Sequence, residues 1–180
     1  LSLAFAQTGT DPRVRTLYFG SAGSNVNDQR ARWCCGGTLG SLVQAGATKY
    51  ILSNNHILAR SDQAPPGSGE DISQPGLIDN GCKPASLVAD FTVAPKLDSN
   101  VDAAIAQLRE GMMDPSGAIL GIGTLSTVWK TPSIGLAVAK SGRTTGVRRG
   151  TVSSTSTAVS VRYALECGSN TGPTYTFRNQ

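Results

Sequence analysis

The chain has 180 residues, of which 39% are hydrophobic and 16% are charged, a composition that suits one core or two small ones and argues against disorder. The net charge of +4 comes from basic residues scattered along the chain, which does not favour nucleic acid as a partner. No apolar run approaches the roughly 20 residues that cross a bilayer, so we expect no membrane span. We therefore expect a globular protein without nucleic acid or membrane partners.

The first six residues, L-S-L-A-F-A, are apolar and end in a pattern that signal peptidase accepts. They lack a basic start and are too short for a complete signal. We expect them to form a first strand or helix, with a signal remnant as the alternative.

Short stretches of strand-forming residues recur along the chain, each flanked by Gly, Pro, Asn, Asp or Ser. No long helical period competes with them, so helix is expected to be minor. We expect an all-β fold, either a barrel or a sandwich. The expected strands cover residues 13–19, 37–43, 49–53, 85–93, 103–108, 134–139, 150–154, 158–165 and 174–177.

Two stretches interrupt this pattern. Residues 61–82 contain P-P-G-S-G and Q-P-G and are expected to form a long surface loop, while D-P-S-G and G-I-G between positions 110 and 123 suit a linker. The first β unit then takes residues 1–110, the interbarrel linker 111–123 and the second unit 124–180. With only about four strands, the second unit is an incomplete barrel, which we expect further polypeptide to complete.

The cysteines are Cys34, Cys35, Cys82 and Cys167, and four cysteines permit three complete pairings. Adjacent cysteines rarely bond to each other, so we expect buried thiols or one bridge. Zinc would require clustered Cys and His residues, which the spacing does not provide. No metal or cofactor is expected, since G-I-G is only a fragment of a dinucleotide fingerprint.

His56, the sole histidine, follows the apolar residues 50–53, so it is expected at a strand end. Asp102 opens a second apolar stretch, where an inward carboxylate is costly unless it meets a donor such as an imidazole N–H. The two residues are therefore candidate catalytic partners, with Asp102 orienting His56 during proton transfer. The alternatives are an ordinary surface or core histidine and an aspartate that caps a strand or turn.

Residues 35–39 are C-G-G-T-L and residues 53–56 are S-N-N-H. These motifs resemble the C-G-G-[ST]-L strand and the T-A-A-H segment of the trypsin-like, or chymotrypsin-fold, serine proteases. Residues 101–105, V-D-A-A-I, take the place of the family's D-I-A strand, and S-G-R-T-T-G at 141–146 resembles a second-barrel hairpin of bacterial members. The order of His before Asp also matches. With Q-P-G at 74–76 and the F-R-N-Q ending, the resemblance to a bacterial branch covers nearly the whole chain.

The resemblance implies a chymotrypsin-like double β-barrel, the second barrel incomplete, that cleaves peptides or proteins. His56 would act as base and then acid, Asp102 would orient it, and a G-D-S-G segment would carry the nucleophile. That segment is absent from these residues; Ser169 in C-G-S-N-T-G-P is the nearest imitation but lacks the preceding aspartate. The family's cysteine after the histidine is also absent, so a bridge from Cys35 to the histidine loop is not expected. We expect a C-terminal fragment to supply the serine, with self-processing after Gln180 as one hypothesis; alone, the chain should be inactive.

Other functions remain open at this stage. A cysteine could be the nucleophile on the same fold. The sequence ends at Gln180, and viral-type relatives of this fold with a cysteine nucleophile cut after Gln. An inactive protease-fold binding module could use residues 61–82 to hold a partner. Nucleic-acid binding through Arg143, Arg148 and Arg149 ranks last, because no aromatic stacking residues accompany them. The composition and the apolar start favour a secreted or extracytoplasmic protein, although unpaired cysteines would favour the opposite.

Overall fold

The computed structural model describes residues 18–180, and the all-β fold expected from the sequence is confirmed. The element expected over residues 1–6 lies outside the described residues, as does most of the strand expected over 13–19. No helix in the described part is long and apolar enough to cross a membrane. Helix there is limited to α1 (Asn55–Leu58) and the 3₁₀ turns η1 (Leu77–Asp79) and η2 (Leu97–Ser99).

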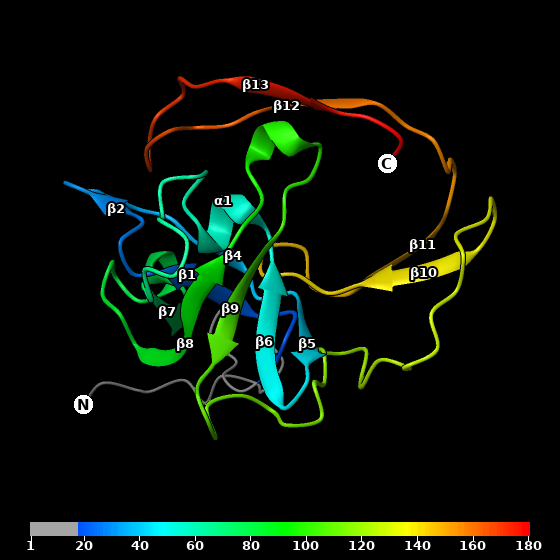
Figure 1. Cartoon of the computed structure of the whole chain (residues 1–180), viewed down its shortest axis with the longest axis horizontal. Coiled ribbons are helices and arrows are strands. Elements are labelled where there is room, and N and C mark those ends of the chain that lie inside the picture. The colour runs from blue at the N-terminus through cyan, green and yellow to red at the C-terminus, as the bar shows by residue number, and fades with distance from the viewer. Residues whose placement is uncertain (1–17) are drawn as a thin grey trace, which may run out of the picture.

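Seven antiparallel strands form the main sheet, in the order β4-β1-β7-β8-β9-β6-β5 (Figure 1). Strands that are distant in sequence are therefore neighbours, which is typical of a barrel rather than of a simple meander. The strands are β1 (Ala22–Asn25), β4 (Gly37–Thr38), β5 (Ser41–Ala45), β6 (Thr48–Ser53), β7 (Asp71–Gln74), β8 (Ser86–Val93) and β9 (Ala104–Leu108).

The two edge strands of this sheet, β4 and β5, are separated in the chain only by Leu39 and Gly40. The sheet must therefore curl until its edges meet, which shields the edges as a barrel does. Gly40 allows the sharp passage from one edge to the other, because a Cβ atom there would lie 2.6 Å from the Leu52 carbonyl oxygen. The single strand expected over residues 37–43 is thus two strands at opposite ends of the sheet.

The inside of the curled sheet is the main hydrophobic core. Ala106 on β9 is opposite both Ile51 on β6 and Phe91 on β8, and its small side chain leaves room for the two larger ones. The fully buried members of this core include Phe19, Leu39, Ile51, Leu58, Ile72, Val88 and Ala106.

Residues 61–82 are not simply a surface loop, and this expectation was wrong. They include β7, which lies inside the sheet between β1 and β8. Its Ser73 and Gln74 are buried, and Gln74 donates hydrogen bonds to the Tyr18 carbonyl and the Ser21 hydroxyl. The sequence analysis missed both β7 and β1 because most of their buried residues are small or polar. The hydrophobic pattern therefore does not reveal either strand.

The remaining strands form three separate pairs, of which the last two follow the first unit as hairpins. The β10–β11 hairpin is exposed along both strands, whereas the β12–β13 hairpin arches over α1 and η2 (Figure 1). The division of the chain at 111–123 stays a prediction. The pairs are β2 (Gln29–Arg30) with β3 (Trp33–Cys34), β10 (Ala137–Lys140) with β11 (Arg148–Thr151), and β12 (Val159–Arg162) with β13 (Thr174–Phe177).

Specific contacts attach the later segments to the first sheet. Met113 is buried in the main core and Ile119 packs against it, so the expected linker is part of the packed body. The loop between β10 and β11 brings Arg143 to the Asp79 carboxylate, with two hydrogen bonds of 2.6 Å, and the Arg143 amide donates to Thr38 Oγ1. The S-G-R-T-T-G motif is therefore a docking loop.

All four cysteines are in disulfide bonds, Cys34 with Cys82 and Cys35 with Cys167. The expectation of buried thiols or a single bridge was wrong. Successive side chains of an extended strand point to opposite sides, so adjacent cysteines can bond different partners. One bridge lies within the first unit and the other joins it to the segment between β12 and β13.

Candidate active site

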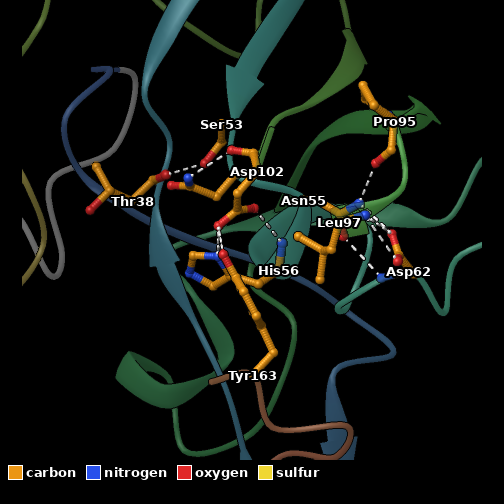
Figure 2. Close-up of polar contacts among 10 residues, drawn as sticks. Thr38, Ser53, Asn55, His56, Asp62, Pro95, Leu97, Asp102 and Tyr163 are labelled. Carbon is orange, nitrogen blue, oxygen red and sulfur yellow. Dashed lines mark hydrogen bonds and ion pairs between the residues drawn. The ribbon is translucent and has the colours of Figure 1, made fainter. Parts of the chain in front are cut away.

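His56 lies on α1, the single short turn that follows β6. The neighbouring Asn55 is fully buried and holds this turn in place: its side-chain Nδ2 donates to Asp62 Oδ1 at 2.6 Å and to the Pro95 carbonyl at 2.7 Å (Figure 2). Asp62 in turn accepts a hydrogen bond from the Leu97 amide. This network fixes the backbone from which the His56 side chain projects.

Sheet pairing brings Asp102 to the same place. Strands β6 and β9 are antiparallel neighbours, and Ser53 at the end of β6 pairs with Ala104 at the start of β9. His56 just after β6 and Asp102 just before β9 therefore lie at the same end of this strand pair. The side-chain amide of Asn54 adds a further contact by donating to the Asp102 backbone carbonyl at 3.0 Å.

The two candidate residues are in direct contact: His56 Nδ1 is 2.6 Å from Asp102 Oδ2, and the His56 backbone amide donates to Oδ1 at 3.2 Å. Burial alone would raise the pKa of Asp102, but the hydrogen bonds and charge of His56, with a further hydrogen bond from Tyr163, hold it below its usual value. An ionised carboxylate only accepts hydrogen bonds, so Nδ1 donates the proton in this contact, and Nε2 is an acceptor whenever the ring is in its neutral form. The His56 side chain is 40% exposed.

Tyr163 is a site residue that the sequence reasoning missed. Its hydroxyl donates to Asp102 Oδ2 at 2.9 Å, and its ring lies 5.8 Å from the His56 ring, centroid to centroid (Figure 2). Burial and the Asp102 carboxylate raise the pKa of Tyr163, which keeps the hydroxyl protonated. No local motif marks this tyrosine, because it reaches the site from the hairpin at the other end of the chain.

A cleft of about 520 Å³ lies beside His56, Asp102 and Tyr163. A larger hollow of about 810 Å³ is lined by residues such as Lys49 and Arg109, and neither member of the His–Asp pair lines it. We place the candidate site in the smaller cleft, because a substrate must reach the imidazole.

Asp28 also lines this cleft. Burial raises its pKa to about 6, although the charges on Arg60 and His56 oppose the shift. A carboxylate oxygen of Asp28 lies within 4.8 Å of the sulfurs of Cys35 and Cys167. These sulfurs are joined in a disulfide, so the three residues are not an assembled metal site.

Replacement of Asp28 by asparagine is expected to stabilise the protein at neutral pH. The folded state binds the Asp28 proton more tightly than the unfolded chain, so stability falls as pH rises from about 4 to about 6 and stays lower above that. Asparagine removes this cost, about 1–2 kcal/mol after allowance for solvent screening. Urea unfolding at pH 7.5 should show the gain and at pH 4 almost none; an equal effect at both pH values would contradict the assignment.

Ser169 does not join the pair. Its hydroxyl is within 2.9 Å of Thr171 Oγ1, and the Thr171 amide donates back to it, so both residues belong to one local turn. The described residues thus bring His56 and Asp102 together, and no serine hydroxyl among them bonds to the imidazole.

No family model matches the sequence, and no curated protein sequence matches it. Among solved structures, the chain is similar to one described as a glutamic-acid-specific serine protease that uses a histidine triad in substrate binding. The TM-score is 0.55 at 20% identity, and the match covers 90% of this chain and 69% of that chain. A likeness at this identity concerns the fold, and it confirms the chymotrypsin-like β fold expected from the sequence.

Proposed function

We propose that this chain is the part of a serine endopeptidase that carries the general base and its orienting acid. The observation that carries the proposal is the 2.6 Å contact between His56 Nδ1 and Asp102 Oδ2 beside an open cleft. The serine protease fold of the structural neighbour supports the same class of reaction.

In this proposal His56 Nε2 accepts the proton of a serine hydroxyl as the serine attacks the peptide carbonyl carbon. The positive imidazolium that forms is stabilised by Asp102, whose carboxylate already accepts the Nδ1 proton. His56 then donates the proton to the leaving amine, and the same groups activate water to release the acyl group. Asp102 stays ionised throughout.

The nucleophile is assigned to polypeptide outside these 180 residues, either continuous with this chain or associated with it. The sequence contains no G-D-S-G segment. The surface also offers a place for further chain: both strands of the β10–β11 hairpin are exposed, and Trp129 nearby in sequence is 82% exposed. Val128, Ile134 and Val138 in the same stretch of chain are also exposed, and a group of exposed apolar residues is typical of a surface that another polypeptide covers.

The substrate class is a peptide or protein, without an assigned cleavage preference. The neighbour's preference for glutamic acid is not transferred, because a chain with one histidine cannot form a histidine triad from these 180 residues. Two disulfide bonds support a secreted or extracytoplasmic location, since such bonds persist in oxidising compartments.

Fluorophosphonate labelling followed by denaturing intact-mass analysis tests the proposal. The complete protein, purified with any polypeptide that is continuous or associated with this chain, should take up one label on a serine outside residues 1–180. His56→Ala should abolish labelling because the serine loses its base. Asp98→Asn, on the exposed part of η2, is the matched control and should label like the wild type.

Labelling that persists in the His56→Ala protein, or a wild-type protein that takes no label, would overturn the proposal. Reaction with iodoacetamide in place of fluorophosphonate would indicate a cysteine nucleophile on the same fold. No reaction with either reagent would favour the inactive binding module.

A further inference from the structure

The Asp102 carboxylate receives hydrogen bonds from two regions of the chain. The His56 backbone amide and ring come from α1, which follows β6, the strand paired with β9. The Tyr163 hydroxyl comes from the β12–β13 hairpin and shares Oδ2 with the His56 ring nitrogen. The pairing of β6 with β9 already brings His56 and Asp102 together without the Tyr163 hydroxyl. The position of this hydroxyl beside the imidazole therefore requires its own explanation.

We propose that Tyr163 is a positioning residue that fixes the Asp102 carboxylate in the orientation that serves His56. The proposal rests on the proposed function, because it assigns Tyr163 to the same proton-transfer step. With Oδ1 bound to the His56 amide and Oδ2 to the tyrosine hydroxyl, the carboxylate cannot rotate away from the ring without losing a hydrogen bond.

The ring of Tyr163 is itself held by packing. It is 7% exposed and forms a small core with Leu97 of η2 and Phe177 of β13. Tyr175 lies 5.8 Å from it, centroid to centroid, in a tilted arrangement. Aromatic contacts of this geometry restrict the ring, so the hydroxyl is presented to Asp102 from a defined direction.

The hairpin that carries Tyr163 is anchored where it turns. Between β12 and β13, Cys167 is bonded to Cys35 and Glu166 forms an ion pair with Arg30. The Leu165 carbonyl accepts a hydrogen bond from the Gln63 side chain. The disulfide thus connects the β3 region of the first unit to the segment that follows Tyr163.

The open end of the hairpin is anchored as well. Just after β13, the Arg178 amide donates to Asn100 Oδ1 at 2.6 Å, and the Asn100 side chain donates to the Arg178 carbonyl at 2.9 Å. Asn100 lies two residues before Asp102, so the hairpin and the carboxylate share one support. We infer that the second unit contributes to the acid–base pair and does not only cover it.

Tyr163→Phe and Tyr175→Phe form the matched pair of variants that tests this role. Both remove one hydroxyl from the same hairpin and keep the ring, but only Tyr163 bonds Asp102. In the full protein, Tyr163→Phe should raise the pKa of Asp102, measured by carbon NMR of the carboxyl group, because one stabilising hydrogen bond is lost. It should also move the His56 Nδ1 proton resonance, identified by its absence from His56→Ala, and slow fluorophosphonate labelling by roughly 10-fold.

Tyr175→Phe should change none of these values. Equal behaviour of the two variants would overturn the proposal and leave Tyr163 as a core residue. If Tyr163→Phe does not fold, incorporation of fluorotyrosine keeps the shape and strengthens the donor, and an unmoved Nδ1 resonance would then refute the role. The NMR readouts need no nucleophile: a shifted carboxyl pKa in a protein that never labels would support the positioning contact while refuting the protease assignment.

Discussion

Under the proposed function, Asp102→Asn is expected to lower kcat/KM of the complete protein for peptide hydrolysis by about 10⁴-fold. An asparagine side chain can donate to His56 Nδ1, which favours the ring tautomer with its proton on Nε2, where the serine proton must be accepted. The amide also cannot neutralise the imidazolium that forms in the transition state. Peptide hydrolysis measured across a range of pH is the test.

The loss should lie mainly in kcat, because in the proposed function Asp102 stabilises the transition state and not the bound substrate. Asp98→Asn removes one negative charge from the exposed η2 turn and should leave kcat/KM unchanged. A similar small effect of both substitutions would mean that Asp102 is a structural residue at the start of β9.

The second large effect concerns stability. The Asp79 side chain is only 5% exposed, and both of its oxygens accept hydrogen bonds from the Arg143 guanidinium. Arg143→Met would leave a buried carboxylate without its cation, at a cost of about 3–5 kcal/mol in the free energy of unfolding. Urea denaturation at neutral pH measures this difference.

Two further variants show whether burial is the cause. Arg148→Met changes an exposed arginine of β11 and should cost less than about 0.5 kcal/mol. Adding Asp79→Leu to Arg143→Met should recover much of the loss, because the buried charge is then removed. Equal costs for Arg143→Met and Arg148→Met would show that the ion pair does not hold the β10–β11 loop against the first unit.

These contacts suggest a division of roles within the described chain. The curled sheet supplies the backbone positions of His56 and Asp102 through the pairing of β6 with β9. The later hairpins are attached by an ion pair, a disulfide and a small aromatic core. Under the proposed function, the attachment of the β12–β13 hairpin would affect activity, because Tyr163 of that hairpin bonds Asp102.

Local sequence patterns were sufficient for the β character, for most strands that follow the hydrophobic pattern, and for the His56 and Asp102 candidates. These features depend on residues close together in the chain: a strand shows its alternation within a few positions, and a histidine after an apolar run marks a strand end. The catalytic role of the pair remains a prediction that labelling can test.

Only the folded structure decided the features that depend on distant residues. Strands β1 and β7 are polar, and their burial is possible because partners elsewhere satisfy their hydrogen bonds. The Cys35–Cys167 disulfide and the contact of Tyr163 with Asp102 join positions that are 132 and 61 residues apart, respectively. No short-range pattern encodes such contacts, because they arise from how the sheet curls and where the last hairpin passes over α1 and η2 (Figure 1).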